Sequence, residues 1–158
     1  MLALLFDMNL LWEEYILLKI KQAAEEKEVN VYGQNSKTFW QNISIRPDIV
    51  IEKDKQTFII DTKWKNIDYS EPSTNDLRQM YVYNDYWNSK KAMLLYPSNE
   101  IIEINDDSFI SFEKTSQKSN HHKCCLGKIS IFDTDNNLDE NIGVKILKWF
   151  DVIPQLSE

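Results

Sequence analysis

The chain has 158 residues, of which 42% are hydrophobic and 27% charged, a balance typical of one globular domain over residues 1–158. Its formal net charge of −7 argues against a protein that holds nucleic acid by electrostatics alone, because lysine and arginine neutralise phosphates. No apolar run approaches the roughly 20 residues that span a bilayer, and the start MLALLFDMNLLWEEY has no basic region or cleavage site of a signal peptide. Adjacent Cys124 and Cys125 offer no disulfide framework. We therefore expect a cytoplasmic protein with no membrane association.

The first half of the chain predicts one helix followed by several strands. Apolar side chains recur near helical spacing from residue 9 to about residue 28. Residues 29–43 mix β-forming and polar side chains, so short strands or a hairpin are expected there. The β-branched runs 45–52 and 57–64 flank the charged turn Lys53-Asp54-Lys55, which predicts an antiparallel hairpin. Phe58-Ile59-Ile60 is continuously apolar, as in a strand buried on both faces.

The second half predicts a helix, further strands and a last helix. Ser73 with Asp76 three residues on resembles a capping box, so a helix should run from there to about residue 88. An apolar strand over 92–96 should stop at Pro97. Further strands are expected over 101–104 and 128–132, a polar loop over 115–123, and an amphipathic helix over 139–150. This order predicts an α/β fold, with a mixed sheet sandwiched by helices.

Three charged residues interrupt the apolar pattern of the predicted hairpin. Asp48 follows Pro47 at the start of one strand, and Asp61 ends the other. Lys63 projects from the same face as Asp61, because side chains alternate along a strand. Two converging carboxylates repel each other unless a cation lies between them, and their oxygen atoms suit Mg²⁺. Such an ion and a lysine together provide the nucleophile and the charge compensation that phosphodiester hydrolysis needs.

Each of these signals also has an ordinary structural explanation. An Asp-x-Lys triplet commonly lies on a solvated strand edge, and Pro-Asp before a strand is often turn chemistry. Gln79 and Tyr83 share one face of the predicted helix, yet an exposed glutamine and a half-buried core tyrosine would give the same pattern. Glu13 and Glu14 suit solvated helix charges as well as a further metal ligand. Only the combination of these residues favours catalysis.

In sequence order these residues resemble the PD-(D/E)xK nuclease superfamily in its RecB-like form. The matching elements are Glu13, Pro47-Asp48, Asp61-Thr62-Lys63 and Gln79-x-x-x-Tyr83. The segments LLFDMNLLWEEYI, ISIRPDIVI, FIIDTKWK and PSTNDLRQMYVYNDYW are similar to the carboxy-terminal nuclease domain of the McrC family, the cleavage subunits of modified-cytosine-dependent restriction systems. The similarity covers residues 4–97 well and is weak beyond them. It implies a restriction endonuclease-like core, with a mixed β-sheet flanked by helices.

The resemblance implies a magnesium site built on the predicted hairpin. Asp48 and Asp61 would be metal ligands, with the Thr62 carbonyl as a further ligand. Lys63 would be the catalytic lysine. The implied cofactor is Mg²⁺, with Mn²⁺ able to take its place.

Two helices complete the implied site. Gln79 and Tyr83 match the family's helix motif, which supports the site and contacts the DNA backbone. Glu13 matches the family's helix glutamate, a further metal ligand, and Glu14 is the alternative for that role.

The implied function is a metal-dependent DNA endonuclease, the cleavage module of a McrBC-type 5-methylcytosine-dependent restriction system. Its partners would be DNA and a McrB-like GTPase motor. Family members bind the motor through an amino-terminal region, and this sequence begins almost at the nuclease segment, so the motor is the weaker expectation and a truncated or split gene product stays open. The alternatives are a catalytically idle DNA-docking or assembly module of the same fold, favoured by the acidic charge, and a repair or junction nuclease.

Two other features are interpreted as structural. The run His121-His122-Lys123-Cys124-Cys125 contains zinc-binding residue types, but adjacent ligands do not easily converge on one tetrahedral ion. We therefore expect a surface loop there. Trp64, Trp87 and Trp149 are expected in the core rather than as platforms for stacking bases.

Overall fold

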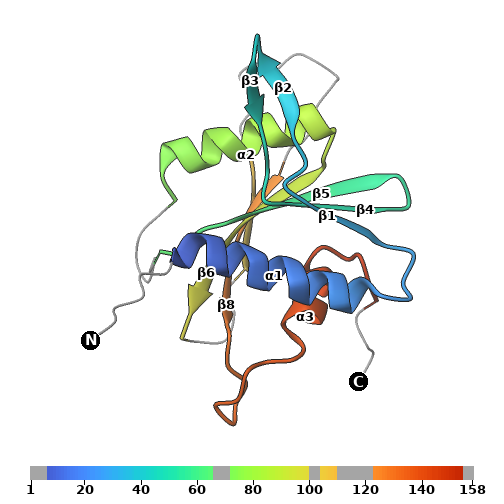
Figure 1. Ribbon diagram of the computed structural model, residues 1–158, viewed down its shortest axis with the longest axis vertical. Coiled ribbons are helices and arrows are strands. Elements are labelled where there is room, and N and C mark those ends of the chain that lie inside the picture. The colour runs from blue at the N-terminus through green and yellow to red at the C-terminus, as the bar shows by residue number, and fades with distance from the viewer. Residues whose placement is uncertain (1–6, 66–71, 100–103, 110–122, 155–158) are drawn as a thin grey trace.

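The computed structural model describes residues 7–65, 72–99, 104–109 and 123–154. They form a six-stranded mixed sheet in the order β1-β4-β5-β6-β8-β7, with helices on both faces, and a separate two-stranded hairpin, β2–β3 (Figure 1). The predicted α/β class, a mixed sheet between helices, is confirmed. No helix of the described part of the chain is long and apolar enough to cross a membrane. The elements are α1 Met8–Ala24, β1 Asn30–Gly33, β2 Lys37–Trp40, β3 Ile43–Ile45, β4 Ile49–Lys53, β5 Gln56–Thr62, α2 Thr74–Trp87, β6 Lys91–Ser98, β7 Ile104–Ser108, β8 Lys123–Ser130 and α3 Ile142–Trp149.

Helix α1 begins at a side-chain cap and buries one stripe against the sheet. The carboxylate of Asp7 accepts hydrogen bonds from the N–H groups of Asn9 and Leu10, which satisfies two donors of the first turn. Trp12, Ile16 and Ile20 are buried at a spacing of four residues. The helix ends at Ala24, four residues earlier than predicted, and Glu26 beyond it has a left-handed backbone with φ of 62°.

The predicted hairpin around residues 53–55 is confirmed as the pair β4–β5. Its antiparallel register runs from Ile49 opposite Ile60 to Lys53 opposite Gln56. The turn residues Asp54 and Lys55 both have positive φ, at 49° and 63°, which is the geometry of a type I′ turn. On its other side β5 pairs in parallel with β6, so β5 is a central strand.

Both faces of the central strands are buried, each in its own core. Phe58 and Ile60 pack in the cluster under α1 and α3. Ile59 belongs to the cluster under α2. Cys124 and Cys125 divide in the same way between the two clusters, so these adjacent cysteines lie on opposite faces of β8.

Two predicted strand limits are wrong, and both errors concern pairing between distant segments. Strand β6 does not stop at Pro97 but continues to Ser98, paired with β8. The carbonyl of Leu95 faces β5, where it accepts from the N–H of Lys63. Pro97, two residues on, turns its nitrogen to the same side, where β5 has already ended, so no ladder bond is lost. Strand β8 begins at Lys123 rather than at residue 128, so the surface loop expected there is wrong for Cys124 and Cys125, which are buried in this strand.

The remaining predictions for the second half vary in outcome. Helix α2 lies where the capping box predicted it, with the Ser73 hydroxyl accepting from the N–H of Asp76. Of the strand predicted over 101–104, only Ile104 lies within the described ranges, where it begins strand β7. Residues 101–103 lie outside those ranges. The same holds for residues 115–122 of the predicted loop, His121 and His122 included. Helix α3 is shorter than predicted, because it begins at Ile142.

The contact between α1 and α3 depends on a glycine, which yields the first prediction. A Cβ atom at position 143 would lie 2.0 Å from the carbonyl oxygen of Lys19. We expect Gly143→Ala to lower the free energy of unfolding by about 1–3 kcal/mol, because α3 must shift away from α1. Helix propensity alone would favour alanine over glycine by about 0.5–1 kcal/mol. Urea denaturation is the measurement, with Lys148→Ala in the same helix as control. Equal or higher stability of Gly143→Ala would contradict this packing.

Candidate functional site

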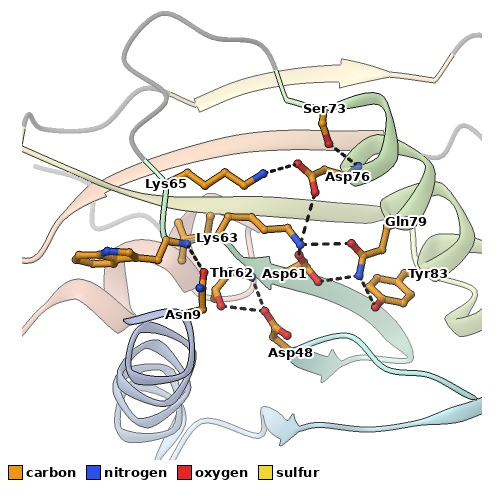
Figure 2. A network of polar contacts seen from close by, with 12 residues as sticks. Asn9, Asp48, Asp61, Thr62, Lys63, Lys65, Ser73, Asp76, Gln79 and Tyr83 are labelled. Atoms are coloured by element: carbon orange, nitrogen blue, oxygen red, sulfur yellow. Dashed lines mark hydrogen bonds and ion pairs between the residues drawn. The ribbon is translucent and has the colours of Figure 1, made fainter. Parts of the chain in front are cut away.

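The hairpin β4–β5 brings Asp48 and Asp61 together at the end of the sheet. Asp48 lies one residue before the last pair of the register, Ile49 with Ile60, which places it across from Asp61. Asp48 Oδ2 accepts hydrogen bonds from the Thr62 N–H at 2.6 Å and from the Thr62 hydroxyl at 2.9 Å (Figure 2). Backbone pairing therefore brings the two aspartates together, and the two hydrogen bonds from Thr62 hold the Asp48 carboxylate in place.

Asp61 is a buried carboxylate with little compensation. Its side chain is only 3% exposed, and its Oδ2 lies 2.6 Å from the ammonium of Lys63. Among the described residues no hydrogen bond of normal geometry reaches this oxygen. Burial, followed by repulsion from Asp48, raises the pKa of Asp61 to about 6, although Lys63 opposes the shift. The site therefore has an excess of negative charge.

Lys63 lies among three carboxylates and faces α2, as Asp61 does. Its Nζ lies 2.6 Å from Asp61 Oδ2 and 3.7 Å from Asp76 Oδ1. Burial alone would lower the pKa of Lys63, but the negative charges around it outweigh burial and raise that pKa above its ordinary value. Lys63 is therefore a protonated ammonium in this arrangement, able to donate but not to accept a proton.

Gln79 and Tyr83 connect α2 to both strands of the hairpin (Figure 2). The Gln79 amide donates to Tyr83 Oη at 2.7 Å and to Asp61 Oδ1 at 3.4 Å, while its carbonyl accepts from Lys63 Nζ at 3.4 Å. The Tyr83 hydroxyl then donates to the main-chain carbonyl of Arg46 at 2.9 Å. Arg46 lies two residues before Asp48, so the helix holds both the lysine and the segment that carries Asp48.

Asp76 and Lys65 also belong to this polar network, although the sequence pattern indicates Asp76 only as a helix cap. Asp76 Oδ2 accepts from Lys65 Nζ at 3.1 Å. Burial would raise the pKa of Asp76, but its hydrogen bonds with Ser73 and Lys65 outweigh burial and lower it. The signal was present in the sequence, because Asp76 lies three residues before Gln79 on the same helix face.

Of the two glutamates in α1, Glu13 lies on the side of the site. It is partly buried and its carboxylate accepts from the Gln34 amide at 3.3 Å, whereas Glu14 is exposed. Burial, and next the negative charge of Asp48, raise the pKa of Glu13. The described residues contain no group of three or more His, Cys, Asp or Glu side chains close enough to hold a metal ion. The carboxylate pair Asp48 and Asp61 is thus the core of the candidate site.

The prediction that Trp64 lies in the core is wrong, since its exposed fraction is 37%. It follows the end of β5, and its ring packs edge-on against that of Trp12, with 5.9 Å between the ring centroids. It lines a surface pocket together with Lys65, Pro97 and Phe132, among others. Trp87 is buried and Trp149 packs partly buried against the core, as predicted.

Comparison with solved structures supports the fold. The chain is similar to a chain in the structure of Thermococcus gammatolerans McrB AAA+ hexamers with bound McrC, with a TM-score of 0.64 and 17% identity. The match covers 96% of this chain and 34% of the other, so the protein spans about a third of the length of the chain it matches. A crystal structure of a protein of unknown function, AF1548, matches with a TM-score of 0.38 and 14% identity, covering 54% of this chain and 50% of that one. No curated protein sequence matches the chain.

Comparison with protein families identifies the chain from its sequence. The family described as McrBC 5-methylcytosine restriction system component matches residues 1–97. These 97 residues are more than half of the 158. They include Glu13, the hairpin with Asp48, Asp61 and Lys63, and the helix with Gln79. The chain therefore belongs to the family described as McrBC 5-methylcytosine restriction system component.

Proposed function

We propose that this chain is a Mg²⁺-dependent DNA endonuclease domain that supplies the cleavage activity of a McrBC-type, 5-methylcytosine-dependent restriction system. The observation that carries the proposal is the convergence of Asp48, Asp61 and Lys63 at one end of the β4–β5 hairpin. Membership of a restriction-system family supports DNA as the substrate. Hydrolysis would break a phosphorus–oxygen bond of the DNA backbone, with water as the nucleophile.

The donor set fits a hard divalent cation. Two carboxylates face each other with incomplete compensation, and a buried oxygen of Asp61 retains capacity for a further partner. The N–H of Thr62 donates to Asp48, and the carbonyl of an extended residue shares the direction of its N–H, which supports the Thr62 carbonyl as a further ligand. Asp48, Asp61 and this carbonyl would hold Mg²⁺, or Mn²⁺ in its place, and Glu13, whose pKa is raised in part by Asp48, would be a further ligand. When bound, the ion supplies positive charge to the phosphate and makes a water easier to deprotonate.

Lys63 supplies the fixed positive charge of the mechanism. Its raised pKa keeps it protonated, so it acts by donating hydrogen bonds to charge that develops on the phosphate oxygens, rather than by removing a proton. A side chain that is 20% exposed can reach a substrate at the surface while its carboxylate partners hold it in place.

Gln79 and Tyr83 act as positioning residues. The Gln79 amide lies between the carboxylate of Asp61 and the ammonium of Lys63, so it orients both groups. Tyr83 fixes Gln79 from one side and the Arg46 carbonyl from the other. These contacts keep the hairpin, and so the two aspartates, in register with the helix.

We further propose that a McrB-like GTPase motor is the partner that directs cleavage. The structure similar to this chain contains McrC bound to McrB hexamers. The chain's own net charge of −7 gives little general attraction for DNA. Recognition of modified cytosine and delivery of DNA would then come from the motor.

The central test is Asp61→Asn, which removes the charge and keeps the shape. We expect plasmid cleavage with Mg²⁺ to fall by at least about 100-fold, the scale of removing an electrostatic element from an active site. Asp54→Asn is the matched control, because Asp54 is exposed at the turn of the same hairpin and asparagine suits its positive φ. Equal cleavage by wild type and Asp61→Asn would refute the site. An intact wild type that never cleaves, with or without a motor, would favour the idle docking module.

The raised pKa of Asp61 predicts how stability depends on pH. A folded-state pKa of about 6 lies above the unfolded value of roughly 3.9, so this group favours folding at low pH and loses that contribution as pH rises from about 4 to 6. In metal-free buffer, Asp61→Asn should therefore become more stable than wild type as pH rises from 4 to 7, by up to about 3 kcal/mol. Urea unfolding at several pH values measures the gap. If the difference in free energy of unfolding between the two proteins stayed constant with pH, the raised pKa of Asp61 would be contradicted. Added Mg²⁺ should make this difference smaller.

The acidic charge predicts that the chain alone binds DNA weakly and cleaves it without selecting for methylation. Its DNA affinity should fall with salt more gently than that of proteins making many phosphate contacts, because few counterions are released. Cleavage should be slow and nearly equal for methylated and unmethylated plasmids, until a cognate McrB-like motor is added with GTP. Filter binding at several salt concentrations and paired plasmid assays are the measurements. Tight binding by the chain alone to methylated duplex would place recognition in this domain instead.

A further inference from the structure

The hairpin β2–β3 carries large apolar side chains into solvent. It stands apart from the main sheet, beside α2 (Figure 1). Trp40 is 60% exposed and Ile43 is 54% exposed, and the two face each other in the hairpin register. Clustered exposed apolar side chains of this kind usually mark an interaction surface rather than a stable free surface.

The hairpin is also free of acidic residues in an acidic chain. The 25 Asp and Glu residues include none between positions 29 and 47, a stretch that contains Lys37 and Arg46. With a formal charge of +2, this stretch differs in sign from the whole chain at −7. An exposed aromatic tip on a basic, acid-free segment is complementary to DNA, whose phosphates attract the cations and whose bases stack on aromatic rings.

The position of the hairpin is fixed relative to the candidate site. Lys37 Nζ donates to the carbonyl of Tyr86 at 2.7 Å and lies 4.7 Å from the ring centroid of Trp87. Phe39 packs against Tyr86 with 5.6 Å between ring centroids. These contacts attach β2 to α2, the helix that carries Gln79.

At its other end the hairpin leads directly into the site. Strand β3 ends at Ile45, and only Arg46 and Pro47 separate it from Asp48. The Arg46 carbonyl is itself held by Tyr83. The tip therefore extends from the same rigid unit as the carboxylates, and DNA that reached Asp48 would lie within reach of the hairpin.

From these observations we infer that β2–β3 is a DNA-contacting wedge, in which Trp40, supported by Ile43, stacks on bases next to the phosphodiester that is cleaved. The inference rests on the proposed function, because it takes DNA as the substrate. It goes further by giving the domain a base-contacting element of its own. Apolar side chains on a rigid support can enter a base step of DNA and unstack it, so this contact requires neither metal ion nor motor.

The test compares DNA binding by Trp40 variants in metal-free buffer, where no cleavage occurs. Fluorescence anisotropy with a labelled duplex should show affinity reduced by about five- to 100-fold for Trp40→Ala, the range for loss of one stacked base. Trp40→Phe should recover most of the affinity, because it keeps an aromatic face. Leu18→Ala is the control, since Leu18 is an exposed apolar residue of comparable exposed fraction, 53%, on α1. A 2-aminopurine in the duplex should brighten with wild type and not with Trp40→Ala.

A second pair of variants tests the charge of the hairpin. Thr38 is exposed and pairs with Ser44 in the β2–β3 register. Thr38→Glu introduces a carboxylate, and Thr38→Gln has the same shape without the charge. We expect Thr38→Glu to weaken DNA binding several-fold at low salt and Thr38→Gln to bind nearly as wild type does, with the difference shrinking as salt rises.

Three outcomes would overturn the wedge. Wild-type DNA affinity retained in Trp40→Ala, or no DNA binding by the wild type in this buffer, would each exclude it. Unchanged DNA affinity with an altered oligomeric state in light scattering would show instead that the hairpin contacts protein. Failure of the nuclease proposal is separate: DNA binding that needs Trp40, in a chain that does not cleave, would leave the wedge standing.

Discussion

The interaction on which the site depends is the burial of one carboxylate, Asp61, beside one ammonium, Lys63. At the end of a strand buried on both faces, a lone Asp61 would carry a large desolvation cost. Lys63 offsets part of that cost at 2.6 Å, yet the pKa of Asp61 is still raised to about 6 because Asp48 lies opposite. The domain therefore maintains, at a fixed place, a charge that is only partly compensated. A protein built for stability alone would fill this position with an apolar residue, so the retained charge is the clearest physical sign of a function.

The rest of the fold can be understood as the support of that pair. A type I′ turn sets the register that puts the two aspartates opposite each other, and parallel pairing with β6 makes β5 a central strand. Helix α2 then covers the face from which Asp61 and Lys63 project. Gln79 is suited to its place because an amide has both a donor end for the carboxylate and an acceptor end for the ammonium. Glutamate or lysine at this position would repel one of the two partners.

Local rules predicted the parts of this arrangement that depend on short segments. Alternation along a strand put Asp61 and Lys63 on one face, and the Ser73 cap located α2. The rules failed where distant segments decide. Strand β6 passes through Pro97 because a neighbouring strand has ended, and Trp64 lies beyond the end of β5 with an exposed fraction of 37%. Local rules indicate Asp76 as a helix cap on the same face as Gln79, but they do not predict its ion contacts with Lys63 and Lys65, which follow the end of β5. The roles of the site residues as metal ligands remain predictions.

Many of the contacts that align the site use main-chain atoms on one side. Tyr83 donates to the carbonyl of Arg46, and the N–H of Thr62 donates to Asp48. A main-chain partner is present whatever side chain the position bears, except that proline has no N–H to donate. The residue type at position 46 can therefore change without loss of this contact, whereas the Tyr83 hydroxyl that donates to its carbonyl cannot be replaced. Such one-sided dependence is how a site of this kind can keep its geometry while most of the surrounding sequence diverges.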